Sequence, residues 1–296
     1  MKEIIYMAKP AWYVEETYPE YPKFYKEFSA QLKEFHEVRA LELPDIWVRD
    51  FLPLQNTKTG QLYQTFFDPR YANYTPKFTA GIRKEVRGYF PQAKPCDVRI
   101  DGGNILLSPD KQYAFCLEKQ TIFRKSDPAK KEYVESELKR ALGVKEILWL
   151  PHQYGDKIGH IDGYIQFSGK FLMVGTVELY NGITTGGLLD SQKELYDYCE
   201  EKNIIDFDTE LVYLLCRPDE NDWLSAKGLY VNFLETSQAV FIPQFHLPED
   251  DMAIQTFKQY TDKPLVPVDC SKIAPYGGAV HCLTREYTLN DKLKIK

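Results

Sequence analysis

Close to its C-terminus the chain reads Tyr276-Gly277-Gly278-Ala279-Val280-His281-Cys282-Leu283-Thr284. The two glycines allow the backbone to turn sharply or to pass close to a small molecule. A short strand-like run follows them and carries His281 and Cys282. A cysteine in this position is either a candidate nucleophile or a small apolar residue of a buried strand, as many free cysteines are. The segments upstream decide between these two interpretations.

Helix-start signals recur along the chain before this segment. Thr75-Pro76 is typical of an N-cap followed by proline at the first helical position. Gly143 is expected to end another helix, which begins at Pro128. The five candidate helices begin at Pro22, Pro76, Pro128, Asp190 and Pro248. Their starts are about 52 to 62 residues apart, and a repeat of this size is typical of stacked supersecondary units.

Each expected unit has the same order of parts. A helix is followed by a short apolar strand, by a loop of polar residues and glycines, and by a hairpin, with hairpin turns expected at residues 108–110, 168–170 and 236–238. One unit cannot bury its own helix and small sheet, so five units stacked around an axis would share one core. We therefore expect a single α/β domain over residues 1–296. Its equivalent loops would point to one central place and carry Asp50, Asp101, His160, Asp162, Asn232 and Cys282.

The composition narrows the possible classes of function. A net charge of −6 and a pI near 5.5 argue against a nucleic-acid-binding protein and suit a cationic small molecule. The apolar run at residues 4–8 is too short for a signal peptide or a membrane span. The six cysteines are scattered without a C-x-x-C pair, which predicts reduced thiols in a cytoplasmic protein that does not act at a membrane.

Five short motifs, one in each unit, together resemble a known family. They are Asp45-Ile-Trp-Val-Arg-Asp50, Asp101-Gly-Gly-Asn104, Gly159-His-Ile-Asp162, Tyr230-Val-Asn-Phe233 and Gly277-Gly-Ala-Val-His-Cys282. In this order they resemble the signature segments of the agmatine deiminase and bacterial peptidylarginine deiminase family, within the guanidino-group-modifying superfamily. The resemblance implies a five-bladed α/β-propeller, or pentein, with pseudo-fivefold repeats around a central active site. It covers nearly the whole chain.

The resemblance also implies a reaction and roles for individual residues. A guanidinium would be hydrolysed to a ureido group with release of ammonia, without a cofactor. Cys282 matches the nucleophile that forms a covalent thiouronium, and His160 matches the general acid and base. Asp50 and Asp162 match the carboxylates that hold the guanidinium by paired hydrogen bonds. Asp101 stands where the family usually has glutamate, so it is expected in the same site with a shorter reach.

Simpler interpretations exist for several of these residues taken singly. Asp50 beside Arg49 would form an ordinary surface ion pair, and Trp47 would be part of the core. His160-x-Asp162 could form a turn or half of a metal site. No H-x-x-x-H pattern or cysteine pair supports zinc, so we expect no metal. The occurrence of all five motifs in register favours the catalytic interpretation.

The sequence leaves the rest of the substrate open. We expect Trp47, Arg49, Asp45, Asn232, Gly277 and Gly278 to line the substrate site, by resemblance. Agmatine is the first candidate, and peptidyl-arginine, free arginine or another arginine derivative are alternatives. A guanidinium-binding protein without catalysis and an amidinotransferase are further alternatives on the same scaffold. A homodimer is compatible with the sequence.

Overall fold

The computed structural model describes residues 2–69, 71–72, 74–118, 128–150, 158–169, 171–177, 201, 211–216 and 224–289. In these residues the fold is α/β, with short sheets and amphipathic helices alternating along the chain. The longer helices are α1 (Trp12–Thr17), α2 (Tyr21–Lys33), α4 (Pro76–Tyr89), α5 (Pro128–Leu142) and α7 (Glu249–Tyr260). Four of the five predicted helices are thus confirmed, and the fourth, at residues 190–202, lies outside the described residues apart from residue 201.

The helix ends follow the local chemistry of the sequence. At the start of α4 the Thr75 hydroxyl accepts a hydrogen bond from the Phe78 backbone N–H at 3.2 Å, and Pro76 takes the first helical position. Beyond the end of α5, Gly143 has φ +79°, a left-handed conformation that glycine adopts at little cost. Its N–H donates to the carbonyl of Lys139 at 2.8 Å, which closes the last turn.

The described strands form five three-stranded sheets with one repeated pattern. In each sheet two strands pair antiparallel and the middle strand also pairs with a third, parallel strand. The strands are β1 (Lys2–Ala8), β2 (Glu37–Leu41), β3 (Leu54–Gln55), β4 (Leu62–Gln64), β5 (Lys94–Pro95), β6 (Leu106–Leu107), β7 (Tyr113–Leu117), β8 (Glu146–Leu150), β9 (Ile165–Ser168), β10 (Phe171–Val177), β11 (Leu211–Cys216), β12 (Leu234–Glu235), β13 (Val240–Gln244), β14 (Leu265–Asp269) and β15 (Arg285–Leu289). The repeat that the helix spacing predicted is therefore present in the sheets.

One of the five sheets joins the two ends of the described chain. β1 lies between β2, to which it is parallel, and β15, to which it is antiparallel, with Lys2 opposite Leu289 and Tyr6 opposite Arg285. Residues Ile4 to Ala8 are completely or almost completely buried. The first unit along the sequence is thus completed by the last strand.

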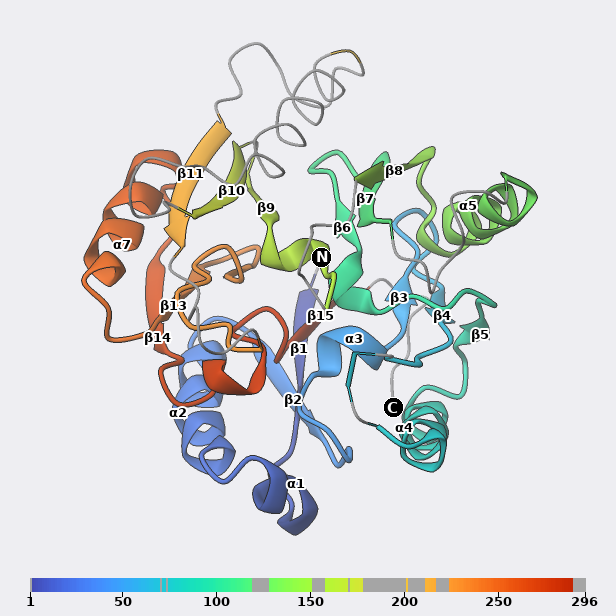
Figure 1. The fold of residues 1–296 in the computed structure, drawn as a ribbon, viewed down its shortest axis with the longest axis horizontal. Coiled ribbons are helices and arrows are strands. Elements are labelled where there is room, and N and C mark those ends of the chain that lie inside the picture. The colour runs from blue at the N-terminus through green and yellow to red at the C-terminus, as the bar shows by residue number, and fades with distance from the viewer. Residues whose placement is uncertain are drawn as a thin grey trace.

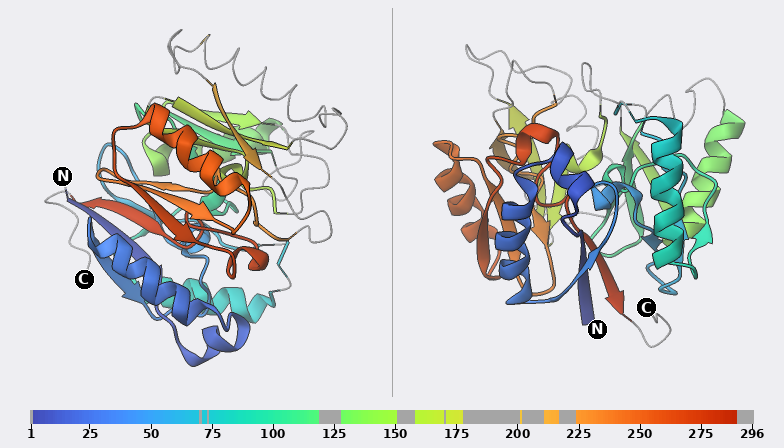
Figure 2. Two further views of the ribbon diagram at one scale, coloured as in Figure 1. Left: turned by 90° about the vertical axis from the view of Figure 1, so that its left-hand side faces the viewer. Right: turned by 90° about the horizontal axis from the view of Figure 1, so that it is seen from below.

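The helices lie outside and the sheets inside (Figures 1 and 2). α2, α4, α5 and α7 are at the periphery in Figure 1, and the connections near the centre contain only short helical turns. The largest cluster of buried side chains extends through α2, β1, β13 and α7. On α2 it includes Tyr21, Phe24, Phe28 and Leu32, which lie at helical spacing on one face. Among the described helices, none combines the length and the apolar composition that crossing a bilayer would require.

Candidate active site

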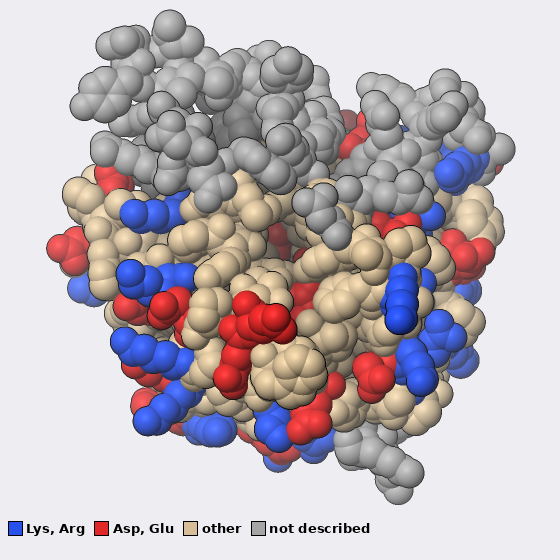
Figure 3. All heavy atoms as spheres, turned by 60° about the horizontal axis from the view of Figure 1, so that its bottom comes forward, with Lys and Arg blue, Asp and Glu red and all other residues tan. Residues whose placement is uncertain are grey.

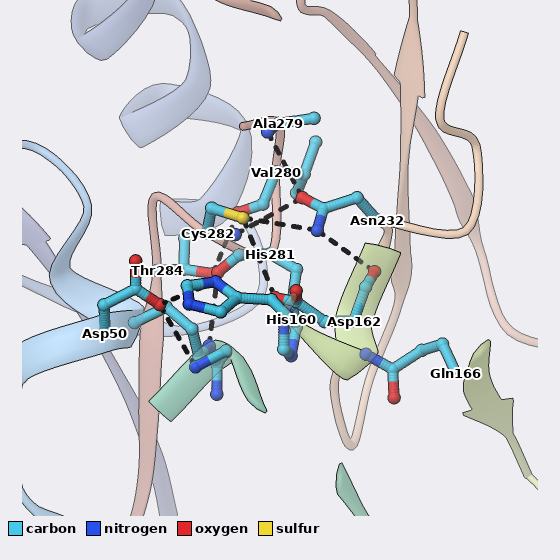
Figure 4. A network of polar contacts seen from close by, with 12 residues as sticks. Asp50, His160, Asp162, Gln166, Asn232, Ala279, Val280, His281, Cys282 and Thr284 are labelled. Carbon is cyan, nitrogen blue, oxygen red and sulfur yellow. Dashed lines mark hydrogen bonds and ion pairs between the residues drawn. The ribbon is translucent and has the colours of Figure 1, made fainter. Parts of the chain in front are cut away.

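Three single-turn helices bring the predicted acidic residues to the centre of the fold. α3 (Val48–Phe51) contains Asp50, η1 (Gly102–Asn104) follows Asp101, and η2 (Ile161–Gly163) follows His160 and contains Asp162. All four side chains belong to buried residues, between 2% and 7% exposed. Figure 4 shows Asp50, His160 and Asp162 converging from different elements. Because three carboxylates share a small buried volume, the centre strongly favours a cation.

His160 links two of these carboxylates. Its Nε2 lies 3.1 Å from Asp101 Oδ2, and its Nδ1 lies 3.5 Å from Asp50 Oδ1. The ring edge of Tyr71 packs against the imidazole, with the ring centroids 5.3 Å apart. The Tyr71 hydroxyl also donates to Asp50 Oδ2 at 3.4 Å. The orientation of His160 is therefore fixed on three sides.

Gly103 makes room for this cluster. Its backbone N–H donates to Asp50 Oδ1 at 3.1 Å. A Cβ atom at this position would lie 2.7 Å from Asp50 Oδ1, 2.8 Å from His160 Nδ1 and 3.3 Å from Asp162 Oδ2. Glycine is thus required at residue 103 because the backbone forms one wall of the site.

Cys282 lies in a turn, and not in a strand. The segment from Val280 to Leu283 is a turn before β15, with the Thr284 N–H donating to the carbonyl of His281 at 3.2 Å. The predicted strand-like run at His281 and Cys282 was wrong, because these residues are buried in a compact turn that Asn232 and Arg49 hold from distant parts of the sequence. Asn232 holds this turn, since its Oδ1 accepts from the N–H groups of Ala279 and Cys282 at 3.2 and 3.4 Å.

The Cys282 sulfur faces the acidic cluster. Its Sγ accepts from Asn232 Nδ2 at 3.3 Å and donates to Asp162 Oδ2 at 3.7 Å (Figure 4). Burial, followed by the charges of Asp162 and Asp50, raises the pKa of the thiol well above its usual value. Without a cation in the site the sulfur is therefore a thiol. A bound cation would counter both neighbouring carboxylates and favour the thiolate.

The two carboxylates closest to the sulfur differ in proton affinity. Burial and the neighbouring Asp101 and Asp162 charges raise the pKa of Asp50 to about 7, although His160 opposes them. Burial would also raise the pKa of Asp162, but the hydrogen bond from His281 and the charges of His281, His160 and Arg49 outweigh it and lower that pKa. Near neutral pH Asp162 is therefore ionised, whereas Asp50 exchanges between its protonated and its ionised form.

The predicted substrate contact Arg49 lies beneath the cysteine turn. Its guanidinium forms a bidentate pair with Glu286, at 3.1 and 2.5 Å, and its Nε donates to the carbonyl of His281 at 3.2 Å. The backbone N–H of Arg49 donates to the carbonyl of Cys282 at 3.2 Å. Arg49 therefore ties α3 to the turn that carries the sulfur, and its hydrogen bonds are to protein groups. This ion pair is absent from the sequence prediction because nothing in the motif pointed to Glu286.

Trp47 and the two glycines 277 and 278 lie beside Cys282. A Cβ on Gly278 would lie 2.5 Å from Trp47 Cζ3 and 2.8 Å from Cys282 Cβ, so the half-buried indole packs directly on the glycine backbone. Gly277 has φ +108° and ends the short helix η3 (Ala274–Tyr276). The sequence predicted close approach of the backbone at this pair, and the approach is to Trp47 at Gly278 and to Leu224 at Gly277.

Asp45 and Asn232 have different surroundings. Asp45, 1% exposed, accepts hydrogen bonds from the hydroxyls of Tyr18 and Tyr74 and from the N–H of Ile46. Burial raises its pKa despite these hydrogen bonds. Asn232 contacts both the sulfur and the backbone carbonyl of Asp162 at 3.2 Å. Asn232 is thus part of the central site, and Asp45 belongs to a cluster with tyrosines next to Trp47.

The sequence prediction missed one histidine of the site. His281 Nδ1 lies 2.7 Å from Asp162 Oδ2, and the His281 ring is buried. Burial and the Arg49 charge lower the pKa of His281. Its position next to Cys282 in the sequence was the only available signal.

One face of the molecule is hollowed. Figure 3 shows a depression in the surface, with acidic atoms visible inside it. Within the described part of the chain, no three His, Cys, Asp or Glu side chains are arranged to hold a metal ion.

Both the sequence and the fold of this chain match known proteins. Residues 18–287 match the family described as Porphyromonas-type peptidyl-arginine deiminase. A protein of Listeria monocytogenes named "Putative agmatine deiminase 2" is 23% identical over 93% of this chain and 82% of its own length. A crystal structure described as "a putative peptidyl-arginine deiminase" has a TM-score of 0.80 at 21% identity, covering 98% of this chain and 97% of that one. The agmatine deiminase of C. jejuni has a TM-score of 0.76 at 18% identity, covering 97% and 93%. At these identities the structural matches establish a shared fold.

Proposed function

Because the chain belongs to the Porphyromonas-type peptidyl-arginine deiminase family, we propose that it hydrolyses a guanidinium group to a ureido group and releases ammonia. The observation that carries the proposal is Cys282, whose sulfur lies 3.7 Å from Asp162 beside the buried cluster of Asp50, Asp101 and His160. A planar cation with several N–H donors fits three carboxylates better than a neutral or anionic compound does.

In the first step the two carboxylates closest to the sulfur fix the guanidinium. Asp50 and Asp162 would accept N–H groups in the guanidinium plane and present its central carbon to Cys282. The bound cation favours the thiolate, which is otherwise opposed by burial and by both carboxylates. The sulfur then forms a bond to carbon, the bond to one terminal nitrogen breaks, and the departing nitrogen leaves as ammonia.

In the second step water replaces the sulfur. His160, held between Asp101 and Asp50, would give a proton to the departing ammonia and then take one from water. Water attacks the thiouronium carbon, the carbon–sulfur bond breaks, and the ureido product leaves with the thiol restored. Overall a guanidinium and water give a ureido compound and ammonium, so no oxidant or other co-reactant is needed.

Agmatine is the substrate that we propose first. Two of the similar proteins are named as agmatine deiminases. The guanidinium of Arg49 is engaged by Glu286 and by the cysteine turn, so this arginine is not positioned to bind the carboxylate of free arginine. The acidic and tyrosine-rich surroundings of Asp45 next to Trp47 suit an amine better.

The architecture that we propose for this chemistry is a five-bladed α/β-propeller in one domain. The five sheets share one strand pattern, and the site residues come from the connections around one centre (Figure 1). In this arrangement each unit contributes a loop to the site, which explains why the six predicted residues are scattered over 233 positions, from residue 50 to residue 282.

The test is to measure ammonia and the ureido product with purified protein on agmatine, free arginine and an arginine-containing peptide. We expect turnover of agmatine that is abolished by Cys282→Ala. Turnover that survives this substitution would overturn the mechanism. Stoichiometric binding without ammonia would indicate a guanidinium-binding protein, and transfer of the amidino group to an added amine would indicate an amidinotransferase.

A further inference from the structure

We infer that His281 is a positioning residue that fixes the carboxylate of Asp162 for the substrate guanidinium, through a hydrogen bond from its Nδ1. This inference rests on the proposed function and deepens it. The two atoms are 2.7 Å apart, the shortest polar contact of any side chain to Asp162 or Asp50 in the described site. Both side chains are buried, with Asp162 2% and His281 7% exposed.

His281 is itself held firmly from two sides. Its backbone N–H donates to the carbonyl of Asn232 at 3.1 Å, and its carbonyl accepts from Arg49 Nε at 3.2 Å. The same turn carries Cys282, whose Sγ also contacts Asp162 Oδ2. One rigid turn therefore positions both the sulfur and, through His281, the carboxylate that would face it across the substrate.

The hydrogen bond from His281 to Oδ2 directs the other oxygen of Asp162, Oδ1, toward the substrate. His281 and Cys282 both contact Oδ2, which leaves Oδ1 to accept an N–H group of the guanidinium. A carboxylate that can rotate would lose this in-plane geometry. Small displacements of a group that positions the substrate lower the reaction rate strongly.

The charge of Asp162 depends on the same contact. The groups that face this carboxylate are His281 and Cys282 from the turn, Arg49 and Asp50 from α3, and His160 from its own segment. Burial and the Arg49 charge lower the pKa of His281, and in either protonation state its ring carries an N–H group. We assign it to Nδ1, because a carboxylate oxygen at 2.7 Å requires a donor.

Two substitutions separate the hydrogen bond from the packing. His281→Asn places an amide N–H close to the position of Nδ1, whereas His281→Leu fills a similar space without a donor. We expect His281→Leu to lower kcat/KM about a hundredfold at pH 7 and to steepen the acid limb of its pH profile from one proton to two. The second proton is that of Asp162, because burial favours the protonated carboxyl group once the hydrogen bond from His281 is lost. His281→Asn should keep kcat/KM within about tenfold of the natural protein, with a single-proton limb.

A binding measurement makes the result independent of turnover. In a Cys282→Ala background, calorimetry of agmatine binding at pH 7 in buffers of different ionisation enthalpy reports the protons released. We expect about one more proton released with His281→Leu than with His281→Asn, because the cation must then ionise Asp162. If the Leu variant does not fold, as judged by thermal unfolding, His281→Phe replaces it.

Each outcome bears on one claim. Equal pH limbs and equal proton release in the Asn and Leu variants would overturn the role of His281, even if deimination is intact. Binding of agmatine without ammonia release by the natural protein would overturn the proposed function, while the proton count would still test His281.

Discussion

At the scale of single residues, the site combines two carboxylates of opposite behaviour. Among the described residues, Asp50 is contacted by the Gly103 N–H and, at longer distances, by Tyr71 and His160, so burial dominates and raises its pKa to about 7. Asp162 has His281 at 2.7 Å and a lowered pKa. The protonation state of the free protein's site near neutral pH is therefore decided by Asp50.

This difference predicts the pH dependence of activity. Below about 7 Asp50 is protonated in the free enzyme, and the site loses one of the charges that bind the cation. We expect kcat/KM for agmatine to fall about tenfold per pH unit below that value, with a one-proton slope. The acid limb of kcat should lie at lower pH, because the bound guanidinium favours the ionised carboxylate.

Steady-state kinetics from pH 5 to 9 would measure both limbs. Protein incubated at each pH and assayed at pH 8 is the control for unfolding. A value of kcat/KM that stays constant from pH 5 to 7 would contradict the assignment of the titrating group to Asp50.

A glycine in the wall of the site gives a second prediction at this scale. In Gly103→Ala the new Cβ would lie 2.7 Å from Asp50 Oδ1 and 2.8 Å from His160 Nδ1. Both side chains must move, so we expect kcat/KM to fall at least about a hundredfold and the free energy of unfolding to fall by about 1–3 kcal/mol.

Gly81→Ala is the matched control for this substitution. Gly81 lies inside α4, and a Cβ there would have no atom within 4 Å. We expect activity to be unchanged and the free energy of unfolding to rise by up to about 1 kcal/mol through helix propensity. Equal activity of the two alanine variants, measured on agmatine, would show that Gly103 is not crowded by the site.

At the scale of elements, the sequence predicted the regular parts of the fold and not the connections. Helix-start signals at prolines located α2, α4, α5 and α7, and the turns at 108–110 and 236–238 lie in the β6–β7 and β12–β13 hairpins. These signals are local, since capping and amphipathic spacing act within one helix. The turn at Cys282 was missed as a turn because its hydrogen bonds come from Asn232 and Arg49, far away in sequence.

The same distinction applies to the candidate site. Cys282, His160, Asp162, Asp50, Asp101 and Asn232 were predicted by motif, and the structure brings all six together. His281, Tyr71 and Glu286 act through other residues, so no short motif contains both partners. Arg49 was predicted as a substrate contact because its motif partner Asp50 is in the site, yet the two adjacent side chains make different contacts.

At the scale of the whole molecule, the shared core predicts how the protein unfolds. Ile5 of β1 is completely buried in the cluster that also includes α2, β13 and α7. Ile5→Ala should lower the free energy of unfolding by about 2–5 kcal/mol. We propose that the chain is one domain, so the natural protein and the variant should each unfold in a single transition.

Urea unfolding followed by circular dichroism, by tyrosine and tryptophan fluorescence and by deimination would test this. Glu3→Ala on the same strand is a poor control because Glu3 caps Ser237. Lys23→Ala, at an exposed position of α2, is better and should change stability by less than about 0.5 kcal/mol. Separate transitions for the probes would contradict a single domain.

The sheet that joins β15 to β1 also sets an order of events during synthesis. β1 leaves the ribosome well before its partner β15, which follows only after residue 284 has been translated. At about 5–20 residues per second this interval lasts roughly 15 to 60 seconds. Throughout it one edge of β1 has no strand beside it, and its side chains at Ile4 to Ala8 lack much of their final cover. The nascent chain therefore carries an apolar strand with an unpaired edge until β15 has been translated, and chaperones that bind such strands can act on β1 throughout this interval.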